Sequence, residues 1–287
     1  CNLGSLCAIQ PPTFTPPRSV AVVLPLTAIL AVVAAVADTT PRPQLRAVRI
    51  SEPVAIDGRL DDAAWRGGAL ITTLVQSSPT EGAPASEATA VHLAYDDAAL
   101  YVAARLRDRA PDSVMALLTR RDRSSQSDFF SLYLDPLGDR RTGYEFTVSA
   151  AGVQSDGTLY NDDWSDDAWD GVWQSSVRRD GEGWIVEMRI PLSQLRVAAA
   201  GSIHWGVNVG RGIGRRNEVS YLIPRLREGS GFVSRFAELL GPDEVTPRRR
   251  AELLPYLTGK HESAPTTLGN PFRTGSQTTP SVGADFR

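Results

Sequence analysis

Apolar residues at every second position between 183 and 190 constrain the fold more than any other feature of the sequence. Every second position in this run is apolar: Trp184, Val186, Met188 and Ile190. Because successive side chains of a β-strand point to opposite faces of the sheet, this period of two places an apolar row on one face. Asp180-Gly181 precedes the run and tolerates positive φ angles, so we predict a β-hairpin whose other strand is residues 172–179.

Shorter segments of the same kind recur along the chain, and turn residues separate them. We expect strands at residues 47–50, 54–56, 88–95, 99–107, 129–134, 144–149, 203–209 and 236–240. Helical patterns are short and fall at residues 61–65, 111–120 and 192–197. Many short strands without long helices predict an all-β fold, an antiparallel, jelly-roll-like β-sandwich with short helical turns, which we place at residues 47–242.

The N-terminal region has the pattern of an export signal. Arg18 precedes an apolar run at residues 20–37, which ends in Ala35-Val36-Ala37, a small-residue motif that suits signal peptidase. A transmembrane helix is the alternative, but Pro25 interrupts the run, which is just long enough to span a bilayer. We therefore expect residues 1–37 to be an N-terminal extension with a cleaved signal peptide, and residues 38–46 to be a linker.

Export and composition exclude several classes of site. Both cysteines, Cys1 and Cys7, precede the expected cleavage point, so the mature chain would have no disulfide, no catalytic cysteine and no cysteine-bound metal. The formal net charge is −3 and the basic runs are short, which disfavours nucleic-acid binding.

Nothing in the sequence indicates a common hydrolase. The chain has three histidines, and it lacks both the Gly-x-Ser-x-Gly and the His-Glu-x-x-His motif. A glycosidase needs only two well-placed carboxylates, which Glu145, Glu187 and the aspartates of residues 162–170 could supply. That activity is the third alternative, and we expect a non-catalytic protein.

Residues 160–173 combine aromatic, acidic and amide side chains outside any clean alternating strand. Flat rings stack on the apolar faces of sugars, while carboxylates and amides hold the hydroxyl groups. The candidate carbohydrate-binding residues are Tyr160, Asn161, Trp164, Trp169 and Trp173. Trp164 has only polar neighbours and is the best candidate for an exposed stacking residue, whereas the alternating flanks of Trp173 also fit the core.

The same stretch holds a cluster of acids. Carboxylate oxygens suit a hard cation such as Ca²⁺, so the candidate metal ligands are Asp162, Asp163, Asp166 and Asp167. Their spacing does not match an EF-hand loop, and a solvated acidic loop without metal is the alternative.

Several short motifs occur in an order that resembles the family 9 carbohydrate-binding modules. They are Ile56-Asp57-Gly58 with residues 61–65, residues 94–97 with 100–102, residues 128–135, Tyr144-Glu145-Phe146, and residues 184–187 leading into Ile190-Pro191. The resemblance covers residues 47–240. It implies a jelly-roll-like sandwich that binds oligosaccharide or polysaccharide on aromatic rims, often with structural calcium.

Two further motifs, residues 169–173 and Leu254-Pro255-Tyr256, look more like a group of bacterial proteins in which such a module precedes an outer-membrane β-barrel. This resemblance implies export to the periplasm or outer membrane of a Gram-negative bacterium, and a role in glycan binding or carbohydrate catabolism. Residues 243–287 would then be a linker and the truncated start of the barrel. A protein-interaction or plug-like domain that serves the barrel without binding sugar is the alternative function.

Overall fold

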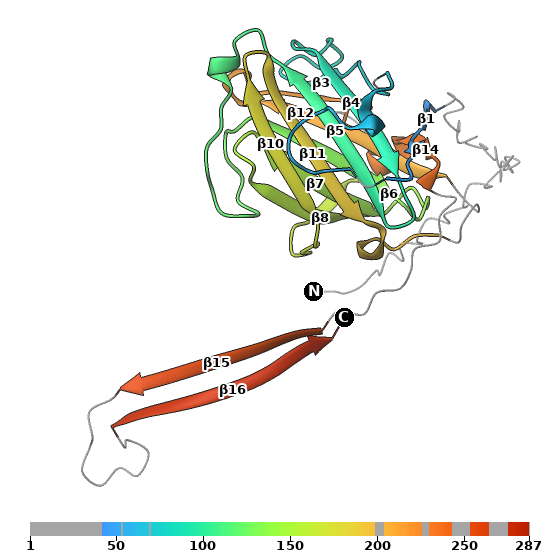
Figure 1. Ribbon diagram of the computed structural model, residues 1–287. Coiled ribbons are helices and arrows are strands. Elements are labelled where there is room, and N and C mark those ends of the chain that lie inside the picture. The colour runs from blue at the N-terminus through green and yellow to red at the C-terminus, as the bar shows by residue number, and fades with distance from the viewer. Residues whose placement is uncertain are drawn as a thin grey trace, which may run out of the picture. The chain divides into compact units, whose positions relative to one another are not determined.

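The structure is a computed structural model (Figure 1), which describes residues 42–52, 54–68, 70–198, 204–225, 230–242, 253–263 and 275–286. The expected signal peptide, residues 20–37, lies outside these ranges. Within them, no helix has the length and apolar character needed to cross a membrane. The helices of the described chain are short 3₁₀ turns, such as Ala63–Trp65 and Leu192–Gln194, so the prediction of an all-β sandwich is confirmed.

The larger of two main sheets, sheet A, has nine strands. Seven lie in the order β1 (Gln44–Arg46), β14 (Ala237–Leu240), β12 (Trp205–Ile213), β6 (Phe129–Asp135), β7 (Gly143–Ser149), β8 (Gln154–Tyr160) and β9 (Trp164–Asp166). β13 (Glu218–Tyr221) also pairs with β12, and β3 (Val75–Ser78) pairs with β13. β1 and β14 run parallel, while the other neighbours are antiparallel. β1 lies among the residues expected to be a linker.

The second sheet, sheet B, packs against sheet A (Figure 1). Its order is β10 (Gln174–Asp180), β11 (Gly183–Pro191), β5 (Ala99–Arg107), β4 (Thr89–Tyr95) and β2 (Val48–Arg49). The predicted hairpin of residues 88–107 is β4 and β5, and the predicted hairpin around residue 181 is β10 and β11.

The alternating row of β11 forms the centre of the core. Its apolar side chains are all fully buried: Trp184, Val186, Met188 and Ile190. They belong to the same cluster as the inward row of β6, which is Phe130, Leu132 and Leu134. Removing a large apolar side chain from water contributes roughly 1.5–3 kcal/mol, so each of these side chains stabilises the sandwich.

The turn of the β10–β11 hairpin lies one residue later than predicted. Asp180 pairs with Gly183, so Gly181 and Glu182 form the turn in place of Asp180-Gly181. Gly183 has a φ of +133°, and a Cβ at that position would lie 2.2 Å from the carbonyl oxygen of Leu106. Only glycine fits there, because a side chain would clash with the neighbouring strand β5.

Several further details of local structure differ from the prediction, and residues 54–56 do not form the expected strand. The helix expected at residues 111–120 is a single turn, Pro111–Ser113. The following residues instead hydrogen-bond to the segment before β6, where the Leu117 amide donates to Ser127 Oγ at 2.8 Å. The strand β8 was not predicted, because its polar sequence QSDGTLY lacks an alternating apolar row.

A separate two-stranded sheet follows in the C-terminal part of the chain. β15 (Leu253–Ser263) and β16 (Ser276–Phe286) each have 11 residues and pair antiparallel along their whole length. The sequence predicted strand character only at residues 251–257 and 281–287, because glycine, proline and hydroxyl residues between them are typical of loops.

Candidate functional site

The outward face of sheet A carries a groove of about 540 Å³. Strand alternation explains its lining, because the residues that lie between the core positions of β6, β7 and β8 point to this face. Many of them are small hydroxyl residues, including Ser127, Ser131, Thr147, Ser149 and Ser155. Hydroxyl groups both donate and accept hydrogen bonds, so the groove offers dense polar contacts to a ligand.

Aromatic rings form one wall of the groove. Tyr133, Tyr221 and Phe232 pack edge to face or tilted, and the ring centroids of Tyr133 and Phe232 are 5.1 Å apart. The guanidinium carbon of Arg225 lies 4.5 Å from the centre of the Phe232 ring. This wall combines apolar area with a cation at the groove surface.

Glycines of β12 make room for these rings. A Cβ on Gly212 would lie 2.1 Å from the ring of Phe129, and one on Gly210 would lie 3.0 Å from the ring of Tyr221. The glycine-rich run at residues 210–214 therefore has a structural cause, since the rings lie directly against the backbone of β12. This run is a sequence signal that could have located the groove.

Glu145 of β7 supplies a carboxylate to the groove. Thr147 Oγ1 donates to its Oε1 at 3.2 Å. Burial raises the pKa of Glu145, while hydrogen bonds from Thr147 and Tyr133 and the charge of Arg225 oppose that rise. Burial and the nearby Glu145 also raise the pKa of Tyr133. Glu145 is therefore a hydrogen-bond acceptor at the groove, held in place by Thr147 and Tyr133.

Trp164, which was predicted to be exposed, lies with Tyr160 on the opposite face of sheet A. Tyr160 and Trp164 face each other across the β8–β9 turn, with exposed fractions of 39% and 61% and ring centroids 5.7 Å apart. The next pair, Leu159 and Ser165, lines the groove. Asn161 lies in the turn itself with a φ of +49°.

Trp169 and Trp173 pack against the sandwich. Trp173 is only 6% exposed, stacks edge to face on Phe146 and donates from Nε1 to Asp156 at 2.6 Å. Trp169 is half-buried, with its ring centroid 5.0 Å from that of Tyr144. The prediction of Trp173 as a stacking residue was therefore wrong, because a sugar cannot reach a ring inside the core.

The four acids predicted to bind a metal do not come together. Asp162 accepts hydrogen bonds from the amides of Phe232 and Ser234, and Asp163 accepts one from the amide of Gly231. Asp166 accepts from the amide of Ala168, and Asp167 lines the groove. Asp162 and Asp163 thus anchor the β8–β9 turn to the segment that carries Phe232.

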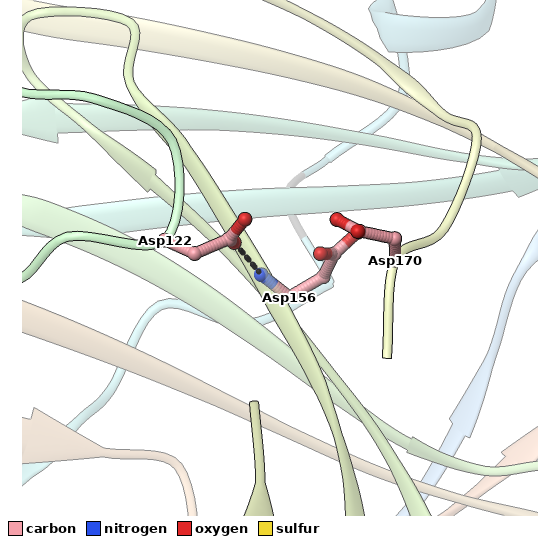
Figure 2. Close-up of side chains that lie close together, drawn as sticks. All are labelled: Asp122, Asp156 and Asp170. Atoms are coloured by element: carbon pink, nitrogen blue, oxygen red, sulfur yellow. Dashed lines mark hydrogen bonds between the residues drawn. The ribbon is translucent and has the colours of Figure 1, made fainter. Parts of the chain in front are cut away.

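A different acidic group does cluster. Among the residues that the structure describes, Asp122, Asp156 and Asp170 form the one group of acids and histidines close enough to share a metal ion, with ligand atoms within 4.8 Å of one another (Figure 2). The Asp156 amide donates to Asp122 Oδ1 at 3.2 Å. The sequence did not indicate this group, because its members come from three separate segments.

The two glutamates that could have formed a glycosidase pair lie on different sheets. Glu145 faces the groove on sheet A. Glu187 of β11 is fully buried on the outward side of sheet B, where it accepts hydrogen bonds from the Gly58 amide at 2.7 Å and from Trp65 Nε1 at 2.9 Å. These two carboxylates therefore cannot act on the same bond.

The chain is similar to several solved structures. A family 9 carbohydrate-binding module from Caldicellulosiruptor kristjanssonii in complex with glucose is 20% identical, with a TM-score of 0.49 over 71% of this chain and 96% of that one. A family 9 module from the same organism in complex with cellotriose is 18% identical, with a TM-score of 0.48 over 72% of this chain and 100% of that one. A proposed carbohydrate-binding protein from Bacteroides uniformis ATCC 8492 is 14% identical, with a TM-score of 0.53 over 69% and 99%, and shares the fold.

No curated protein matches the chain. The sequence profile of the family described as "Carbohydrate family 9 binding domain-like" matches residues 56–210, which is more than half of the 287 residues. This range runs from the Ile56-Asp57-Gly58 motif to the glycine of β12 beneath the groove. The chain therefore belongs to the carbohydrate family 9 binding domain-like family.

Proposed function

We propose that the sandwich binds oligosaccharide or polysaccharide in the groove on sheet A, without catalysing a reaction. The observation that carries this proposal is the lining, in which a field of serine and threonine hydroxyls surrounds Glu145 and a wall of aromatic rings. Sugars present hydroxyl groups on their edges and apolar C–H groups on their faces, so they match both parts of this lining. Membership of the carbohydrate family 9 binding domain-like family supports this class of ligand.

The Tyr160–Trp164 pair offers a second contact for a longer glycan. β9 is the last strand of sheet A, so the groove and the aromatic pair lie on the two faces of one edge. A polysaccharide that leaves the groove past Ser165 meets the exposed ring of Trp164 as it turns round that edge. Asn161 adds an amide there, whereas Trp169 packs against Tyr144.

The alternative is a protein-interaction or plug-like domain without sugar binding. A protein partner favours a contiguous apolar patch. The groove is instead polar and concave, which favours sugar over a protein surface.

The hairpin β15–β16 supports a membrane context. Cross-strand pairing places Pro255, Leu257, Val282 and Ala284 on one face, followed by His261 and Thr278. The other face carries Tyr256 together with Thr258, Lys260, Thr279 and Ser281, so it is the more polar of the two. Strands of 9–11 residues that are apolar on one face and polar on the other are typical of outer-membrane barrels. We propose that this hairpin begins such a barrel, and that the sandwich serves it in the periplasm or outer membrane of a Gram-negative bacterium after removal of residues 1–37.

A groove-filling variant tests the proposed site. The purified chain is screened on a glycan array, and the affinity for the best ligand is measured by calorimetry. Ser124→Trp places a large ring at the groove, and we expect at least a tenfold loss of affinity. Ser113→Trp is the matched control, because Ser113 is also exposed but lies in a 3₁₀ turn away from the groove lining. Absence of binding to any glycan, or equal binding by both variants, would contradict the proposal.

A further inference from the structure

Arg121 contacts each of the three carboxylates that Figure 2 shows. Its Nη2 is 2.6 Å from Asp156 Oδ2. Its Nε lies 3.4 Å from Asp122 Oδ2 and 3.6 Å from Asp170 Oδ1. One guanidinium therefore forms ion pairs with all three acids.

Asp156 is the buried member of the cluster and depends most on this cation. Its side chain is fully buried, while Arg121 is 37% exposed. Asp156 Oδ2 accepts hydrogen bonds from Arg121, from the Gly171 amide at 3.0 Å and from Trp173 Nε1 at 2.6 Å. Its other oxygen, Oδ1, is buried without a hydrogen-bond partner. An ionised carboxylate in this position is costly unless a positive charge compensates it.

Arg121 also hydrogen-bonds to the uncharged oxygen atoms that a metal ion would need as ligands. Its Nη2 donates to the carbonyl oxygen of Gly171 at 3.0 Å, and its Nη1 donates to Gln154 Oε1 at 2.9 Å. Calcium requires six to eight oxygen ligands. Asp156 Oδ2 already accepts three donors, and a divalent ion beside the guanidinium would be repelled by its charge. The residues present therefore do not fit a bound calcium ion.

We propose that Arg121 replaces a divalent cation in this cluster, so that the sandwich folds there without calcium. The guanidinium does what a metal would do, because it ties the loop at residues 119–123 to β8 and to the loop at residues 167–172. Without the guanidinium, the same three carboxylates and the freed Gly171 carbonyl become a binding site for a divalent or trivalent cation. This inference does not rest on sugar binding.

Terbium luminescence tests the proposal, with Tb³⁺ as a probe for calcium sites. Trp173 donates to Asp156, so an ion in the cluster would lie close enough to receive energy from the excited indole. We expect no saturable sensitised emission from the wild-type chain, and the same melting temperature in chelator and in millimolar calcium. Arg121→Gln should show saturable emission and a melting temperature that falls in chelator and recovers with calcium.

Two further variants keep the test decisive. Arg121→Lys retains a positive charge and should remain without emission. Asp170→Asn in the Arg121→Gln background removes an exposed ligand and should abolish the emission. Saturable emission from the wild-type chain that Asp170→Asn removes would overturn the proposal. A folded Arg121→Gln chain without emission would also overturn the proposal. If Arg121→Gln folds only in the presence of calcium, that dependence supports the proposal.

Discussion

Trp65 Nε1 donates a 2.9 Å hydrogen bond to Glu187 Oε1, across 122 positions of the chain. The other oxygen of this carboxylate accepts hydrogen bonds from the backbone amides of Asp57 and Gly58, at 3.0 and 2.7 Å. A single buried side chain of β11 thus fixes both ends of the segment from residue 57 to residue 65. Burial raises the pKa of Glu187, and these three donors oppose that rise.

Glu187→Ala should destabilise the sandwich by about 3 kcal/mol or more. Three donors would lose their acceptor, and a buried donor left unsatisfied costs roughly 1–3 kcal/mol. Urea unfolding followed by tryptophan fluorescence measures the loss. Glu187→Gln keeps one acceptor oxygen and should cost less than Glu187→Ala. An equal loss in both variants would show that side-chain volume, and not hydrogen bonding, is what matters at this position.

Trp184→Ala should lower the free energy of unfolding by about 3–5 kcal/mol, the usual cost of truncating a large buried aromatic. Trp184 is fully buried at the head of the β11 row. Trp164→Ala is the matched control, because an exposed tryptophan at the end of sheet A should cost roughly 0.5 kcal/mol or less. Similar midpoints for the two variants would be inconsistent with the core described above.

Asp135→Asn should stabilise the protein at pH 8 and have little effect at pH 3. Burial raises the pKa of Asp135 to about 6 from 3.8. Because the folded state holds the proton more tightly, the stability of the wild type falls as the pH rises from about 4 to about 6. This rise in pKa corresponds to about 3 kcal/mol of folding free energy lost at high pH, and asparagine removes this cost. Thermal melts of both proteins between pH 3 and pH 8 measure the effect, and a stability difference that does not change with pH would refute it.

Glu145→Ala should weaken sugar binding at least tenfold, which corresponds to about 1.4 kcal/mol. The variant removes the carboxylate from the groove while leaving the apolar core of β7 unchanged. Calorimetry with the best glycan from the array measures the affinity, and a melting curve shows whether the fold persists. Thr147→Val, which removes one hydroxyl from the same strand, should lose less. Unchanged affinity for Glu145→Ala would move the site out of the groove.

Trp164→Ala should discriminate between short and long ligands. We expect an oligosaccharide that fits within the groove to bind as before, because Trp164 lies on the other face of β9. Binding to an insoluble polysaccharide in a pull-down should fall several-fold, since the chain would lose its contact beyond the edge. Equal retention of the polysaccharide would confine the site to the groove.

The alternation of apolar residues along the strands predicted the core, but it did not predict most of the groove. The β11 row and the exposed position of Trp164 both followed from the local pattern of neighbours. The groove could not be predicted in this way, because its lining is the polar half of alternating strands, and alternation does not reveal which outward face is concave. Asp162 and Asp163 were predicted to be metal ligands because the sequence shows their charge. It does not show the backbone amides of residues 231–234, which donate hydrogen bonds to them.

The strands at the margins of the two sheets have a consequence for the behaviour of the protein in concentrated solution. β9 has only three residues and ends at Asp166, while β10 carries Arg178, Arg179 and Asp180. A short or charged margin offers few free backbone groups to an incoming strand and repels a second copy. At β9 and β10, sheets A and B therefore end in a way that resists strand-by-strand aggregation when many copies are crowded together.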